Sequence, residues 1–245
     1  MSNDKRFALR ANIFVLRLAR NWLRIALTVL SIYVMLPIAA PTLMRLGIEG
    51  PARVIYTIYT PFCHQLPFRS LFLYGEQVAY PRFNVPNTSL RPFEDFAADL
   101  PEFAGLDIYA FNVDILNAGR RFYGNEQMGY KMTLCARDIF IYGALLAVGL
   151  VYAIPAVRRR LRPVPLWLYV FLGLGPIGID GFSQLLSYPP FEWWPVRETG
   201  PSFRVLTGAV FGAMTGWLGF PYLEDSFKQT QYVIESKLRR ANIDV

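Results

Sequence analysis

IALTVLSIYVMLPIAAPTLM, residues 25–44, is the stretch that decides the fold class, because it carries no charged side chain over its whole length. An α-helix needs about 20 apolar residues to cross a hydrocarbon core about 30 Å thick. Residues 139–157, 164–186 and 205–223 form three more such stretches, and Asp180 is their one charged residue. Each stretch is too long and too uniformly apolar for a strand of a soluble protein. The sequence therefore predicts an all-α membrane protein, a four-span transmembrane helix bundle.

A cleaved secretory signal is the competing interpretation of the first stretch. Ile38-Ala39-Ala40 resembles a small-residue cleavage site, but Pro41 would follow the cut and the basic leader is long. We therefore expect a retained membrane anchor rather than a removed signal.

The composition agrees with a membrane protein. Hydrophobic residues make up 53% of the 245 residues and charged residues only 18%, whereas a soluble domain carries about 25% charged residues. The net charge of +7 comes from basic residues that lie beside the apolar stretches. No nucleic-acid-binding signature accompanies them, so we expect the lipid bilayer, and no nucleic acid, as a partner.

The basic residues also predict the orientation, because Lys and Arg gather on the cytoplasmic side of short loops. They concentrate in residues 1–24, 158–162 and 224–245, which fall on one side if there are four spans. The opposite link, residues 187–202, carries Arg197 as its one basic residue. We therefore expect a multi-pass protein of the cell membrane with cytoplasmic N- and C-termini.

Three segments flank or interrupt the predicted membrane domain, residues 25–223. Residues 1–24 are basic and amphipathic, and they either lie on the anionic leaflet or extend the first span inward. Residues 224–245 are expected to form a second amphipathic cytoplasmic helix. The outer segment, residues 47–137, is predicted to be irregular, with short helices near residues 93–98 and 109–122.

Gly208, Gly212 and Gly216 recur at a spacing of four in the last predicted span. Such a spacing forms a smooth helix face that another backbone can approach closely. We expect this face either to pack inside the protein or to receive a membrane protein partner.

Polar residues fall into three clusters that the predicted topology brings to the outer membrane face. Asp180 and Gln184 share a helix face, and a carboxylate within a span is costly unless it is paired. Arg137 and Arg204 are its expected partners, in a structural ion pair or in an outward-facing pocket for a lipid head group or small solute. The predicted pocket residues are Cys63, His64, Gln65, Arg69, Ser70, Cys135, Arg137, Asp138, Asp180, Gln184 and Arg204.

The chemistry of these residues leaves several hypotheses open. Cys63 and Cys135 can form a disulfide, worth about 4 kcal/mol for such a long loop, or remain free thiols. A metal or haem site using Cys63, His64, Cys135 and Asp180 is a further alternative, but it is not the favoured one, because His64 is the one histidine and lies next to Cys63. No cofactor motif is recognisable, so the cofactor stays unknown. Asp180 is the candidate acid/base of an alternative membrane enzyme for a lipid, isoprenoid or quinone, and a small oligomeric transporter is a third hypothesis.

Several motifs resemble an uncharacterised family of bacterial and archaeal membrane proteins, domain of unknown function 2085. These motifs are CHQLPFRSLFLYGEQ (63–77), GNEQMGYKMTLCARDIFIYG (124–143), GIDGFSQLL (178–186) and RETGPSFRVLTGAVFG (197–212). The resemblance implies a membrane fold and a role for the clustered polar residues, but it implies no reaction. The chain departs from the family pattern after Glu198, where relatives tend to have Ser-Thr-Asn.

Overall fold

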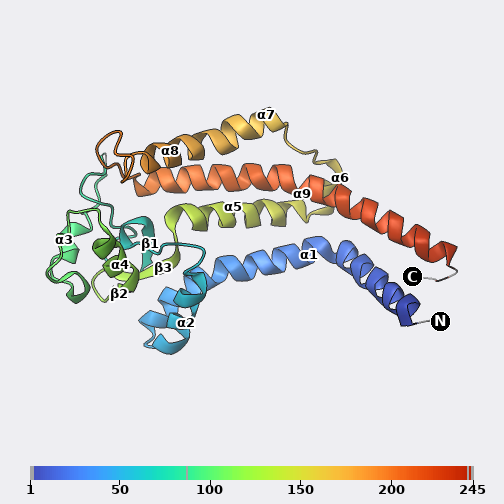
Figure 1. The fold of residues 1–245 in the computed structure, drawn as a ribbon, viewed down its shortest axis with the longest axis horizontal. Coiled ribbons are helices and arrows are strands. Elements are labelled where there is room, and N and C mark those ends of the chain that lie inside the picture. Colours follow the sequence, from blue (N-terminus) through green and yellow to red (C-terminus); the bar gives the residue numbers. More distant parts are fainter. Residues whose placement is uncertain (1–2, 87, 242, 244–245) are drawn as a thin grey trace.

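A computed structural model describes residues 3–86, 88–241 and 243, and it is mostly helical. Residues 1–2 of the predicted N-terminal segment, and residues 242 and 244–245 of the predicted C-terminal helix, lie outside the described residues. Helices α1, α5, α8 and α9 run side by side, with the outer segment at one end and both termini at the other (Figure 1). Their bounds are α1 (Asn3–Arg45), α5 (Ala136–Tyr152), α7 (Leu166–Leu168) with the π-helical η3 (Tyr169–Leu174) and α8 (Gly175–Leu185), and α9 (Pro201–Arg240).

Two of the described helical runs are long and apolar enough to cross a membrane, Arg6–Arg45 and Leu166–Leu185. The prediction of four spans is therefore supported at two of its four stretches. Helix α5 has 17 residues and ends before Pro155, which begins α6 (Pro155–Arg160). Helix α9 runs on to Arg240 through a charged second half.

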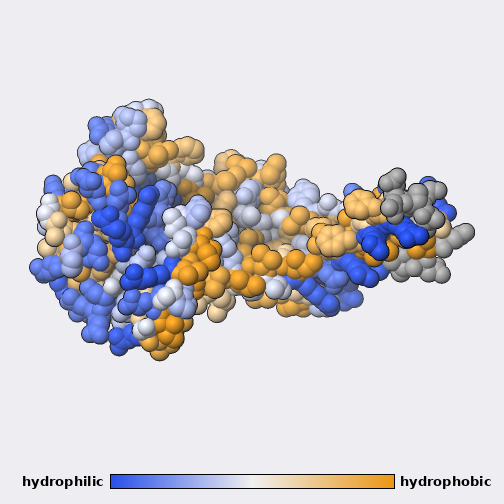
Figure 2. Space-filling model, turned by 60° about the horizontal axis from the view of Figure 1, so that its bottom comes forward, coloured by the Kyte–Doolittle hydropathy of each residue, from blue (hydrophilic) through white to orange (hydrophobic). Residues whose placement is uncertain are grey.

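The apolar windows of the two long runs are mostly exposed, with 22% and 11% of their residues buried. A core helix of a soluble protein would bury most of such a window. Apolar residues occupy much of the middle of the molecule and hydrophilic residues gather at the end formed by the outer segment (Figure 2). Large exposed side chains include Val29, Ile32, Met35, Leu150, Phe171, Ile179, Phe182 and Leu206.

The three regularly spaced glycines of α9 face α5 within the same chain. A Cβ at Gly208 would lie 2.5 Å from the carbonyl oxygen of Arg137, and one at Gly212 would lie 2.1 Å from that of Ile141. A Cβ at Gly216 would meet the side chain of Val148 at 2.9 Å. The face predicted to pack internally or to receive a partner is thus covered by α5.

The terminal segments continue helices α1 and α9 and pack on each other. Helix α1 is unbroken from Asn3, so the expected boundary near residue 24 is not a break, and α9 likewise passes residue 223. Leu16, Ile234 and Leu238 are buried together. The predicted apolar face of the N-terminal segment is only partly used, since Phe7 stays exposed.

The outer segment contains short helices and a small sheet that was not predicted from the sequence. The sheet is antiparallel in the order β1-β3-β2, with strands β1 (Ser70–Leu73), β2 (Gly124–Asn125) and β3 (Gly129–Cys135). The helices are α2 (Glu49–Tyr59), α3 (Glu94–Ala97) and α4 (Val113–Arg121), with single turns η1 (Pro67–Arg69) and η2 (Pro101–Phe103). Helices α3 and α4 lie inside the two ranges expected to be helical.

The sheet brings the two cysteine motifs together. Ser70 of β1 pairs with Cys135 of β3, and α5 starts at the next residue, Ala136. Lys131 of β3 is fully buried, and its ammonium donates to the carbonyls of Gln65 at 2.7 Å and Gly119 at 2.8 Å. A buried ammonium is costly unless it is hydrogen-bonded. Lys131 therefore ties the turn after Cys63 to helix α4 and the sheet.

Candidate functional site

A cavity of about 290 Å³ lies where the turn after α2, the start of α5, the end of α8 and the start of α9 meet. Most of the predicted pocket residues line it. They are Cys63, His64, Gln65, Arg69, Cys135, Arg137, Asp138, Gln184 and Arg204, and the wall is completed by Phe62, Leu66, Gly181, Leu185 and Tyr188.

Ser70 and Asp180 are the two predicted pocket residues that do not line this cavity. The Ser70 hydroxyl is buried and donates to the carbonyl of Leu66 at 2.9 Å, which closes the η1 turn. Asp180 lies behind the cavity wall with 2% of its surface exposed. Its carboxylate therefore acts on the cavity only through its neighbours.

The Asp180 carboxylate is fully partnered. It accepts from a guanidinium nitrogen of Arg137, from Arg197 Nη2 at 2.9 Å, and from the Thr199 hydroxyl at 2.8 Å to Oδ1. Of the two expected partners, Arg137 is correct and Arg204 is wrong. Arg204 lies at the start of α9 and pairs with a different carboxylate, that of Glu198.

Glu198 is the centre of a second buried cluster. Its carboxylate receives Arg69 Nη2 at 2.6 Å, Arg204 Nη2 at 2.8 Å, Gln184 Nε2 at 2.6 Å and the Tyr188 hydroxyl at 2.6 Å. Hydrogen bonds to a charged group are stronger than neutral ones, so this network fixes the relative positions of its members. The cluster joins η1, α8 and α9 at one point.

Charge pairing has a larger effect than burial on the pKa values of Arg69 and Glu198. Burial alone raises the pKa of the Glu198 carboxyl, but Arg69 and then Arg204 more than compensate, so that this pKa is lowered from its ordinary value. Burial alone lowers the pKa of the Arg69 guanidinium, but the Glu198 carboxylate reverses the effect and raises it. Both groups are therefore charged at neutral pH.

Each of the three arginines on the cavity wall keeps donor capacity. Arg69, Arg137 and Arg204 bind the two buried carboxylates through Nε or Nη2. Within the described part of the chain, none of the three arginines donates a hydrogen bond to protein from its Nη1 atom. In addition, Arg137 Nε is buried without a partner. A guanidinium has five N–H donors in a rigid fork. The unused donors belong to side chains that line the cavity.

The side chains that line the cavity directly include more basic than acidic groups. Three arginines line the cavity against one carboxylate, that of Asp138, while the carboxylates of Glu198 and Asp180 pair with these arginines from behind the wall. At His64, which also lines the cavity, burial first, and then Arg120 and Arg69, lower the pKa of the imidazole. His64 is therefore neutral at neutral pH.

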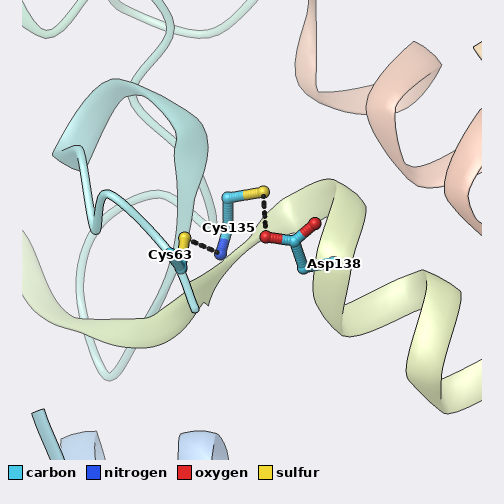
Figure 3. Close-up of side chains that lie close together, drawn as sticks. All are labelled: Cys63, Cys135 and Asp138. Carbon is cyan, nitrogen blue, oxygen red and sulfur yellow. Dashed lines mark hydrogen bonds between the residues drawn. The ribbon is translucent and has the colours of Figure 1, made fainter. Parts of the chain in front are cut away.

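The two cysteines are free thiols that lie side by side with Asp138 (Figure 3). Cys63 Sγ accepts the backbone N–H of Cys135 at 3.2 Å, and the Cys135 thiol donates to Asp138 Oδ2 at 3.1 Å. The contact with Cys135 lowers the pKa of Cys63, while the contact with Cys63, followed by burial, raises the pKa of Cys135. The proton therefore stays on Cys135 when Cys63 ionises.

Several residues of the site were missed by sequence reasoning. Arg197, Glu198, Thr199 and Tyr188 hold the two clusters together. The available signal was the Arg-Glu pair in the link before the last predicted span, within a stretch that resembles the family. Thr199 departs from the family pattern, yet it supplies a hydroxyl to Asp180.

Comparison with known proteins gives one match. No curated protein and no solved structure matches the chain. The matched region runs from the start of β2 through the first half of α9, and so includes Cys135, Arg137, Asp180, Glu198 and Arg204. The resemblance suggested by the sequence motifs is confirmed, since residues 122–218 match the family model described as "Predicted membrane protein (DUF2085)".

Proposed function

We propose that this chain is a polytopic membrane protein that binds the anionic head group of a lipid in the arginine-lined cavity at the outer end of its helix bundle. The observation that carries this proposal is the set of three arginines on the cavity wall. Their charges are held in place from behind by two buried carboxylates, and each keeps unused N–H donors.

The proposed membrane arrangement has four spans, formed by α1, α5, the run from α7 to α8, and the first half of α9. Helix α5 has 17 residues, which is within the range of about 17–25 that spans a bilayer. It lies beside α9 along the close glycine face. The basic residues of the link 158–162 and of the terminal segments all fall at the end opposite the cavity (Figure 1). The positive-inside rule then makes both termini cytoplasmic.

An anionic ligand fits the donors of the cavity. Arg69, Arg137 and Arg204 present planar guanidinium groups, which match phosphate in a bidentate manner. Arg204 is nearly buried, with 5% of its side chain exposed, so its hydrogen bonds form with little competition from water. A phosphate or phosphoglycerol group therefore satisfies N–H groups that have no protein partner.

A lipid fits better than a free solute because of the neighbouring surface. An apolar cavity of about 610 Å³ between α1, α5 and α9 shares Phe62 with the polar cavity. Its wall includes Val29, Tyr33 and Phe220. An amphiphile can thus place its chain against these residues and its head group against the arginines.

The geometry does not favour Asp180 as an acid/base. A general acid or base must reach the proton that it transfers, whereas the Asp180 carboxylate is already bound by Arg137, Arg197 and Thr199 behind the wall. The structural role considered for Asp180, an ion pair that fixes helix register, agrees with these contacts.

The test is native mass spectrometry of the full chain, delipidated in mild detergent and titrated with a phosphatidylglycerol and, separately, a phosphatidylcholine. We expect the wild type to retain the anionic lipid in preference to the zwitterionic one. A hydrogen bond to a charged group is worth about 1.5–3 kcal/mol. The Arg137→Gln variant should therefore bind the anionic lipid about 10–100-fold more weakly.

The matched control is Arg121→Gln, which removes an exposed outer arginine that does not line the cavity. It should bind like the wild type. Wild-type protein that shows no preference for the anionic lipid would contradict the proposal, as would an Arg121→Gln variant that loses as much affinity as Arg137→Gln.

A further inference from the structure

Cys63, Cys135 and Asp138 form a group of potential metal ligands on the wall of the cavity. One ligand atom of each, two Sγ atoms and a carboxylate oxygen, all lie within 4.8 Å of one another. Cys63 comes from the turn after α2, Cys135 from the end of β3, and Asp138 from the first turn of α5 (Figure 3). The β1–β3 pairing, which sets Ser70 opposite Cys135, holds these elements in register.

The spacing suits a tetrahedral ion. Zinc binds thiolate sulfur at about 2.3 Å and carboxylate oxygen at about 2.0–2.2 Å, so ligand atoms of one zinc lie about 3.5–3.8 Å apart. Cys135 Sγ and Asp138 Oδ2 are 3.1 Å apart, and Cys63 Sγ lies within the same group. Small side-chain rotations therefore bring the three atoms to coordinating distances without moving the backbone.

The backbone around Cys63 favours a deprotonated sulfur at that residue. Cys63 Sγ accepts two backbone N–H groups, from Cys135 at 3.2 Å and from Gln65 at 3.5 Å. Gln65 adopts a left-handed conformation with φ of +54°, which is unusual for a residue other than glycine and directs its N–H at that sulfur. Two thiolates and a carboxylate bring three negative charges, which Zn²⁺ and the adjacent Arg69 and Arg137 offset.

We infer that Cys63, Cys135 and Asp138 form a binding site for one thiophilic divalent cation, zinc in the first instance, whose fourth position opens to the cavity. Three protein ligands with one open position are typical of accessible zinc sites. His64 is not part of the group, which agrees with the expectation that adjacent Cys63 and His64 do not aim at one ion. This inference does not rest on the lipid proposal.

The experiment uses the full chain, purified in detergent under a phosphine reductant and freed of metal with a chelator. Cobalt(II) is the spectroscopic probe, because thiolate coordination gives a near-ultraviolet charge-transfer band and tetrahedral geometry gives intense visible bands. We expect one equivalent of Co²⁺ to bind and Zn²⁺ to displace it. Cys63→Ser and Cys135→Ser should each lose about half of the charge-transfer intensity. Loss of an outer-shell partner already weakens metal binding about 10–100-fold, so each variant should weaken zinc binding by at least that factor.

A carboxylate variant with its matched control and a thiol-protection measurement complete the test. Asp138→Asn should weaken zinc binding about 10-fold or more, whereas Asp114→Asn, at an exposed outer carboxylate, should leave it unchanged. In the wild type, excess Zn²⁺ should protect both thiols from a maleimide under native conditions, a readout that needs no variant. Absence of the charge-transfer band, or full maleimide labelling in the presence of zinc, would overturn the inference. A pair that closes as a disulfide and binds no metal after reduction would overturn it as well.

Discussion

Glu198 receives hydrogen bonds from four side chains, which lie on η1, on α8, in the loop after α8 and on α9. Its burial would be unfavourable without this pairing, because an unpaired charge in a dry site is costly. Paired with Arg69 and Arg204, it instead locks the start of α9 against η1. The position of the cavity wall therefore depends on one side chain.

Replacing Glu198 with Gln should destabilise the folded protein by about 3–5 kcal/mol, because Arg69 and Arg204 would then lie buried without their counter-charge. The measurement is the free energy of unfolding of the purified protein in mixed detergent micelles. Glu192→Gln, at an exposed carboxylate of the same loop, is the control. It should change stability by less than about 0.5 kcal/mol. Equal effects of the two changes would show that the Glu198 cluster does not hold the fold.

From the same carboxylate we predict that the stability of the folded protein depends on pH. The pKa of Glu198 is lowered in the folded state, so the folded protein holds its proton less tightly than the unfolded chain does. Its contribution to stability is then fully present above the ordinary glutamate pKa of about 4.3. That contribution is lost as the pH falls below this value and through the folded pKa. The unfolding temperature should therefore drop more steeply on acidification in the wild type than in Glu198→Gln, and parallel profiles would contradict this assignment.

At the scale of elements, the closest helix contact is that of α9 with α5. Two helix backbones approach here without side chains between them, so van der Waals packing replaces the hydrophobic effect that drives association in water. The approach is tightest at Gly212, opposite the carbonyl of Ile141.

Gly212→Ala should destabilise the protein by about 1–3 kcal/mol, the usual effect of overpacking, because its Cβ would meet backbone that cannot rotate away. Gly219 lies on the same helix, and an alanine Cβ at that position would have no other atom within 4 Å. Gly219→Ala should be neutral or slightly stabilising, since alanine favours helix by about 1 kcal/mol over glycine. Thermal unfolding in detergent measures both, and a larger loss at Gly219 would argue against this helix pairing.

The sequence was most informative where the signal is local. Apolar stretches predicted the helical runs, and polar residues at their ends predicted most of the cavity wall. The sheet was not predicted because β1 and β3 are about 60 residues apart in sequence. A strand as short as β1 also shows no clear alternation of apolar and polar residues. Arg197 and Glu198 were missed for a related reason, since their partners on η1 and α8 become neighbours only when the loop folds back.

At the scale of the whole molecule, polar residues gather at one end, apolar side chains face outward along the middle, and the basic terminal segments lie at the other end (Figures 1 and 2). This distribution matches a bilayer between two aqueous phases. In the proposed membrane arrangement, the cavity lies at the boundary between the outer head groups and the outer segment, where a ligand that is part of the membrane can enter it from the side.

Photo-crosslinking shows directly whether an anionic lipid occupies the cavity. The reconstituted protein is irradiated with an anionic lipid that carries a diazirine beside its phosphate, and the labelled peptides are mapped. We predict label on the segments 62–69, 135–138 and 181–188, which contain most of the residues that line the cavity. We also predict strong competition by unlabelled anionic lipid but not by zwitterionic lipid. Label confined to the exposed apolar faces of α1 and α8, and unaffected by head-group charge, would contradict a head-group site in this cavity.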